Sequence, residues 1–238
     1  MSLVGLIIAL LVTFFAAAIQ GVVGIGFAMV SVPILALIDP ALAPVPQLLV
    51  TIPLTISMAW RERSHVQFAN VTWIVAGRIP GVLLGVGLLA VATQRSLDLA
   101  IAAMVLLAVG IIASGHNVRR TKVTEFGAGA LSGVLSFVAS IGGPPLALLY
   151  SRDDGPTRRS NLAVVFTIGL IVTLIARTAS GNMTWDDVLV ALILFPALAL
   201  GYASSLRFKS LVPQRFAKVT ILVLSTAGAV GLIIRAIS

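Results

Sequence analysis

The side chains that this sequence contains limit the chemistry that it can perform. There is no cysteine, and the two histidines, His65 and His116, are too few for a convincing histidine metal centre. All eight acidic residues fall in predicted loops or at the ends of long apolar segments, so no carboxylate lies inside those segments for a proton relay or for hydrolysis. We therefore expect no enzyme activity, no cofactor and no metal, and an anion as the ligand.

One basic residue does lie inside an apolar segment. Arg78 follows Val71 by seven positions, which is about 10 Å along a helix with a rise of 1.5 Å per residue. Its guanidinium could bind two oxygens of an anion, or it could reach the lipid headgroups along its aliphatic stem. We favour anion binding, and the other interpretation stays open. Arg177 is expected to be an anchor at the outer surface.

Small polar residues gather at two interruptions of otherwise helical sequence. Residues 3–38 carry no charge, are too long for one crossing and contain Gly21-Val22-Val23-Gly24-Ile25-Gly26, while residues 125–150 are broken by Ser140-Ile141-Gly142-Gly143-Pro144-Pro145. Free N–H groups at such breaks can hold an anion, although small residues also serve close helix packing. The candidate substrate-binding residues besides Arg78 are Gly24, Gly26, Ser31, Gln47, Thr51, Ser136, Ser140, Gly142, Gly143, Asn161 and Thr167.

The composition places these candidates in a lipid bilayer. Only 10% of the residues are charged, 59% are hydrophobic and the mean hydropathy is +1.11, whereas about 25% of the residues of a soluble domain are charged. The net charge of +8 is then a matter of membrane topology and not of nucleic-acid binding. The amino terminus lacks the basic leader of a secretory signal, and we expect it to stay in the mature protein. Six stretches predict membrane spans, at residues 41–60, 71–92, 97–114, 160–179, 188–206 and 213–237.

The sequence also repeats itself with an offset of 112 positions. This offset aligns Gly21-Val22 with Gly133-Val134, Pro33 with Pro145, Thr55-Ile56 with Thr167-Ile168, and Asn70-Val71-Thr72-Trp73 with Asn182-Met183-Thr184-Trp185. We therefore predict two homologous membrane repeats, at residues 1–114 and 125–238, joined by a cytoplasmic linker at residues 115–124.

The basic residues indicate how the two repeats are oriented. If residues 125–150 enter and leave on the same side, twelve of the sixteen basic residues lie in loops on one side, as the positive-inside rule requires. The predicted fold is an all-α integral membrane protein with two inverted repeats, each an interrupted or re-entrant helical hairpin plus three transmembrane helices. The predicted cytoplasmic loops are residues 61–70, 115–125, 151–159 and 207–218. Charge does not decide whether residues 3–38 cross the membrane.

This pattern resembles the TauE/SafE sulfite exporter family, also called the four-toluene-sulfonate uptake permease group. The resemblance covers most of the chain and rests on the glycine-rich first segment that ends in Val32-Pro33, on Gly142-Gly143-Pro144-Pro145 and on the duplicated arrangement. Phe27 and Ala28 depart from the usual glycine cluster of the first motif. The resemblance implies transport of sulfite, sulfonates, thiosulfate or related organosulfur and carboxylate anions by a multi-pass protein of the bacterial inner membrane.

The residues and the resemblance together predict a secondary transporter that exports a small sulfur-containing anion through a central site at the two interruptions and Arg78. Export is favoured because an inside-negative potential drives a monovalent anion outward with about 2.3 kcal/mol per 100 mV. An anion channel or a membrane scaffold subunit is the alternative. The expected partners are a small anion and membrane lipid, with no nucleic acid. The oligomeric state stays open, and a homodimer is one option.

Overall fold

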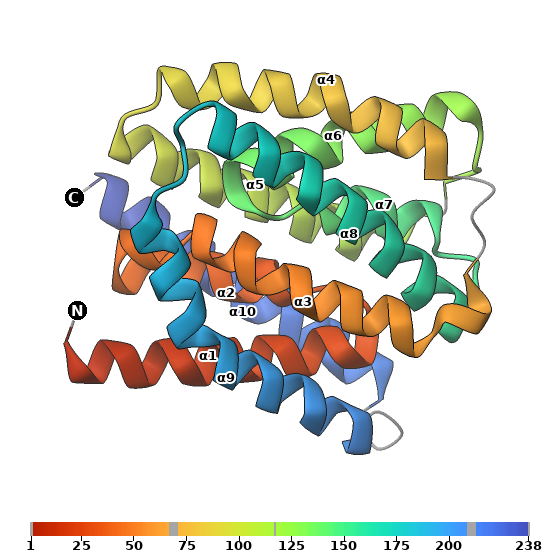
Figure 1. Cartoon of the computed structure of the whole chain (residues 1–238), viewed down its shortest axis with the longest axis horizontal. Coiled ribbons are helices and arrows are strands. Elements are labelled where there is room, and N and C mark those ends of the chain that lie inside the picture. Colours follow the sequence, from red (N-terminus) through yellow and green to blue (C-terminus); the bar gives the residue numbers. More distant parts are fainter. Residues whose placement is uncertain (1, 67–70, 117, 209–212, 238) are drawn as a thin grey trace.

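The computed structural model describes residues 2–66, 71–116, 118–208 and 213–237 (Figure 1). Asn70 of the repeat, and the parts of the predicted loops at residues 67–70, 117 and 209–212, lie outside the described residues. Within the described ranges the regular structure is helical and strands are absent. The helices are α1 (Leu3–Val23), α2 (Phe27–Ile38), α3 (Val45–Arg61), α4 (Val71–Ala90), α5 (Gln94–Ser114), α6 (Lys122–Ala139), α7 (Gly143–Leu149), α8 (Gly155–Ala179), α9 (Trp185–Phe208) and α10 (Gln214–Ile237), with short 3-10 turns at Pro40–Leu42 and Arg63–His65.

Seven segments among the described residues are long and apolar enough to cross a membrane. Six of them coincide with the six predicted spans, which are thereby confirmed as helices of membrane-spanning length. The seventh is Leu3–Val23, which is α1, and the helix that follows it, α2, is a shorter apolar helix of 12 residues. The first interrupted segment therefore consists of one helix of full spanning length and one short helix.

Both predicted interruptions are present, and each has a local cause in the backbone. Gly24 and Gly26 end α1 and begin α2 with φ of +98° and +118°, a conformation that glycine adopts without steric cost. The break after α6 is a helix end of the αL type, in which Ser140 has φ of +57° and its N–H donates to the Ser136 carbonyl at 2.9 Å.

The contacts between helices link the two halves of the chain throughout. Helix α4 lies along α6, α1 lies along α9, α3 contacts α8, and α5 contacts α10. The two ends of the chain lie at one end of the bundle, and the described parts of the connections after α3, α5 and α7 lie at the other end (Figure 1). The two interruptions meet in the interior of this arrangement.

Helices α4 and α6 approach so closely that their backbones touch. A Cβ atom added to Gly81 of α4 would lie 2.0 Å from the Ala130 carbonyl oxygen, and one added to Gly129 of α6 would lie 2.1 Å from the Ile74 carbonyl oxygen. Only glycine fits at these two positions, and small residues at helix interfaces are a common device in membrane proteins. This close contact places Arg78 of α4 beside α6, the helix that leads into the second interruption.

Ion pairs with buried carboxylates hold helices together near both ends of the bundle. The Arg159 guanidinium at the start of α8 donates to the Glu62 carboxylate at 2.8 Å, and the Arg235 guanidinium near the end of α10 binds the Asp98 carboxylate at 2.6 Å. Both carboxylates belong to residues at the ends of predicted spans. They are engaged in structural pairs and lie outside the cavity described next.

Candidate functional site

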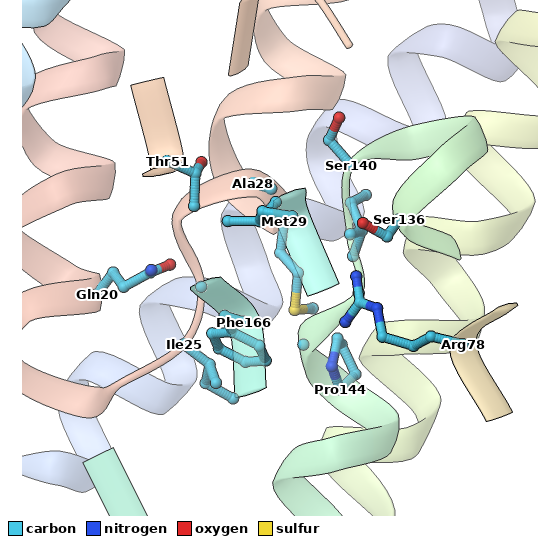
Figure 2. Close-up of a pocket in the computed structure, with 15 residues that line it drawn as sticks. Gln20, Ile25, Ala28, Met29, Thr51, Arg78, Ser136, Ser140, Pro144 and Phe166 are labelled. Carbon is cyan, nitrogen blue, oxygen red and sulfur yellow. The ribbon is translucent and has the colours of Figure 1, made fainter. Parts of the chain in front are cut away.

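A small cavity lies between the two helix interruptions in the interior of the bundle (Figure 2). Its volume is about 40 Å³, roughly three times what a single water molecule needs. The first interruption contributes Gly26 and the start of α2, the second contributes Ser140 to Pro144, and α4 and α8 contribute Arg78 and Phe166. The cavity is therefore assembled from both halves of the chain.

Arg78 supplies the only cation among the described residues that line this cavity, and none of those residues is acidic. Its side chain is 1% exposed and extends from α4 toward Met29, between Ser136 and Pro144 (Figure 2). One terminal nitrogen donates to the Ser132 hydroxyl at 3.0 Å, while Nε is buried without a partner among the described residues. A buried cation is costly unless an opposite charge accompanies it, so this site is suited to an anion.

The position of the Arg78 guanidinium is set by two neighbours. A Cβ atom at Gly169 of α8 would lie 2.1 Å from the Arg78 Cζ atom, so the guanidinium rests directly on the α8 backbone. The Ser132 hydroxyl that accepts from Arg78 donates in turn to the Gly142 carbonyl at 2.6 Å. Arg78 is thus connected through one side chain to the tip of the second interruption.

The first interruption presents backbone amides to the cavity. The Gln20 side-chain oxygen accepts from the Phe27 N–H at 2.9 Å and so satisfies the first amide of α2. The next two amides belong to Ala28 and Met29, which line the cavity and have no hydrogen-bond acceptor among the described residues. Unpaired amides at the first turn of a helix are donors suited to an anion.

The polar side chains of the second interruption are partly engaged by the protein itself. The Ser140 hydroxyl donates to the Pro44 carbonyl at 2.8 Å, and the Ser136 hydroxyl lies 3.2 Å from the Thr173 hydroxyl. The proton of Ser140 is therefore used to join the tip of the second half to the first half. Gly142 and Gly143 line the cavity, and their amides have no hydrogen-bond acceptor among the described residues.

The structure brings together more than half of the residues that the sequence nominated for the site. Those that line the cavity are Gly26, Thr51, Arg78, Ser136, Ser140, Gly142 and Gly143. Those that do not line it are Gly24, Ser31, Gln47, Asn161 and Thr167.

The residues outside the cavity wall have other positions. Gly24 forms the end of α1 with the backbone conformation given above. Gln47 donates to the carbonyl of Leu42 at 3.2 Å, and Thr167 donates to Thr55 at 3.0 Å. Ser31 and Asn161 are buried within the helix bundle.

Sequence reasoning missed several residues that build the site. Gln20, Ile25 and Phe166 line the cavity, and Ser132 holds Arg78. A signal for two of them was available, because the offset of 112 that aligns the repeats also aligns Gln20 with Ser132. In each half this position carries a side chain that binds the backbone of the following break.

The expectation for Arg177 is wrong. Its side chain is 3% exposed, so it does not lie on the surface. It donates to the carbonyl of Phe137 and, at 3.4 Å, to the carbonyl of Val138, in the last turn of α6. A cation at the carboxyl end of a helix neutralises its unpaired carbonyls, so Arg177 stabilises the helix that leads into the second interruption.

Comparison with known proteins gives one match. The family model described as sulfite exporter TauE/SafE matches residues 9–232 of the chain. No curated protein and no solved structure matches. The matched region contains both interruptions, Arg78 and every other residue that lines the central cavity.

Proposed function

Because the chain belongs to the sulfite exporter TauE/SafE family, we propose that it is a secondary transporter that exports a small sulfur-containing anion across a bacterial inner membrane. Membership of this family and seven apolar helices make it a multi-pass membrane protein of a transport family. The observation that carries the proposal is Arg78, a buried cation whose Nε has no partner, at a cavity where no acidic residue is found, both among the described residues.

The proposed cargo is sulfite or an oxyanion of similar size. The guanidinium offers parallel N–H donors that match two oxygens of an oxyanion. The amides of Ala28 and Met29 on one side, and of Gly142 and Gly143 on the other, supply further donors at the cavity wall. A volume of about 40 Å³ favours a small inorganic anion over an aromatic sulfonate.

The proposed architecture is a pair of inverted repeats, residues 1–114 and 125–238, with a linker at residues 115–124. Two observations support it. The contact of α4 with α6 has a counterpart in the contact of α9 with α1, as expected if α4 corresponds to α9 and α6 to α1. The Thr167 hydroxyl donates to the Thr55 hydroxyl at 3.0 Å, and these two residues are aligned by the repeat offset, as expected of a position beside a local twofold axis.

The basic residues orient the bundle in the membrane, and the membrane potential favours one direction of transport. We assign the cytoplasm to the end that holds the connections after α3, α5 and α7, because the basic residues gather there. An inside-negative potential then drives a monovalent anion outward without a coupling ion, with about 2.3 kcal/mol per 100 mV.

Flux of labelled sulfite in proteoliposomes tests the function. We expect flux that saturates with sulfite concentration, increases with a potential that is negative on the sulfite-loaded side, and shows counterflow, because a carrier that exposes its site to the two sides in turn can also return with cargo bound. Acetate and 2-aminoethanesulfonate should compete weakly or not at all. Conductance without counterflow would identify a channel, and the absence of flux above that of empty liposomes would favour a scaffold subunit.

Single cysteines test the sidedness, since the chain contains none of its own. Ser64→Cys and Arg207→Cys should be protected from an impermeant thiol reagent in intact cells, and Ser180→Cys should react; all three positions are exposed. Ser180 precedes α9 and Arg207 lies in its last turn, so a single spanning helix separates the two positions. Labelling of Arg207→Cys together with protection of Ser180→Cys would reject the proposed orientation.

A further inference from the structure

A second, larger cavity lies next to the central one. Its volume is about 400 Å³, and its lining includes Gly115 and His116 after α5, Ser151 after α7, and the beginnings of α8 and α10. These segments belong to the end of the bundle that we assign to the cytoplasm. Ile25 lines both cavities, so its side chain lies between the second cavity and the site at Arg78.

The lining of this second cavity is basic. Arg215 and Lys218 of α10 are three positions apart and therefore lie on one face of the helix, together with Ile221 one turn further on, and all three line the cavity. Arg158 of α8 also lines it. Among the described residues that line this cavity, none is acidic.

The two cations of α10 contribute most of the positive charge at this cavity. The carboxylates of Asp153 and Asp154 act on Arg158, which reduces its effect on the cavity. In the described part of the chain no ion pair involves Arg215 or Lys218, and the neighbouring residues 209–212 contain no acid. These two cations therefore line the cavity without an ion-pair partner among the described residues.

Ile25 forms part of the wall between the cavities. It is 8% exposed and lies between Gly24 and Gly26, whose positive φ angles form the tip of the first interruption. A Cβ atom at Gly143 would lie 3.7 Å from the Ile25 Cγ2 atom, so the Ile25 side chain contacts the tip of the second interruption. An apolar side chain in this position blocks an ion, because passage would strip the ion of its water.

We propose that the second cavity is a vestibule that gathers the anion from the cytoplasm, and that Ile25 closes the passage from this vestibule to Arg78. This inference rests on the proposed function and adds the access route and its barrier. A cleft lined by charge of one sign raises the local concentration of the opposite ion and its association rate by roughly 10- to 1,000-fold. The vestibule would therefore supply the central site at low cytoplasmic anion concentrations.

The electrostatic part is tested by thiol reactivity, which needs no transport. Ser151→Cys places a thiol in the vestibule, and its reaction rates with a sulfonate-tailed and a trimethylammonium-tailed methanethiosulfonate are compared in detergent. We expect the anionic reagent to be favoured, and neutralisation by Arg215→Gln with Lys218→Gln to lower the anion-to-cation rate ratio about tenfold. High salt should lower the ratio in the parent chain as well.

A matched control distinguishes an effect of the vestibule cations from a general effect of positive charge on this ratio. Arg207 is a basic residue near the same end of the bundle, and it does not line the vestibule. Arg207→Gln should therefore leave the ratio unchanged. An unchanged ratio in the Arg215→Gln, Lys218→Gln chain, or an equal drop in the Arg207→Gln chain, would overturn the vestibule. Because sulfite flux is not measured, this result stands apart from success or failure of the proposed function.

The barrier is tested with a thiol in the central cavity. Ser136→Cys should react slowly with the anionic reagent, and adding Ile25→Ala should speed the reaction several-fold. Ile112→Ala trims a buried side chain that lines only the vestibule and should have no such effect. Thermal melting of each variant shows whether it is folded, and Ile25→Val provides a milder change if Ile25→Ala unfolds. Equal reaction rates in folded chains with and without the Ile25 change would overturn the barrier.

Discussion

Replacement of Arg78 by alanine is expected to abolish saturable sulfite flux and to leave a folded protein in the membrane. The guanidinium is the cation of the central cavity, and its desolvation is not offset by an acidic residue among those that line the cavity. Removal of an uncompensated buried charge relieves that cost, so the melting temperature without sulfite should stay the same or rise. Arg78→Lys keeps the charge but loses the planar pair of donors, and it should retain part of the flux.

Two measurements distinguish a binding role of Arg78 from a structural one. Sulfite should raise the melting temperature of the parent protein, because a ligand that binds only the folded state stabilises it, and it should have no effect on Arg78→Ala. Gly169→Ala keeps the arginine but places a methyl group where its guanidinium lies, so it should also lose affinity. Gly110→Ala, where a Cβ meets no atom within 4 Å, is the control. Normal sulfite affinity in both Arg78→Ala and Gly169→Ala would remove Arg78 from the site.

Replacement of Gly129 by alanine is expected to be among the most damaging single methyl additions in this chain. The new Cβ would lie 2.1 Å from the Ile74 carbonyl oxygen, and since this atom belongs to the backbone, α4 and α6 must separate. Overpacking typically costs about 1–3 kcal/mol and occasionally more, and a clash with backbone belongs at the upper end. We expect a lower melting temperature, a lower yield of folded protein and, because Arg78 lies on α4, weaker sulfite binding.

The same helix offers a control for this substitution. Gly127 lies two residues earlier in α6, and a Cβ there meets no atom within 4 Å. Gly127→Ala should keep or raise the melting temperature, because alanine is favoured over glycine in a helix by up to about 1 kcal/mol. If Gly129→Ala and Gly127→Ala melt at the same temperature in detergent, the close contact of α4 with α6 is wrong.

The spans and the breaks could be predicted from the sequence because each has a local cause. A run of about 20 apolar residues must be helical in a bilayer, and glycine at positions 24 and 26 marks the point where α1 ends. The choice of site residues was less successful, because the contrast between an apolar and a polar face, which usually identifies the buried side of a helix, is missing here. In α4 the residues around Arg78 are apolar on every side, whether they face lipid or the interior, so the sequence does not show which side chains share a face with the cavity.

Contacts between segments that are distant in the chain could not be predicted from the sequence either. Ser140 was recognised as a residue of the second break, but its hydroxyl donates to Pro44, which lies 96 positions earlier and in the other half. Nothing in the local pattern of either segment indicates this pair. Arg177 was misplaced for a similar reason, since the carbonyl groups that it binds belong to α6 and are recognised only once α8 is known to lie beside them.

The backbone contact between α4 and α6 has a consequence for motion. Helices separated by side chains can slide past each other by small repacking steps, whereas helices in contact through glycine have no such layer to rearrange. Helices α4 and α6 should therefore move as one rigid body. Arg78 is attached to this body through α4, and Ser132, which links it to Gly142, is attached through α6. A change of conformation that opens the site would then move Arg78 and Ser132 together and maintain their contacts with the anion. The tip of the first interruption, which contains Ile25, would move relative to them.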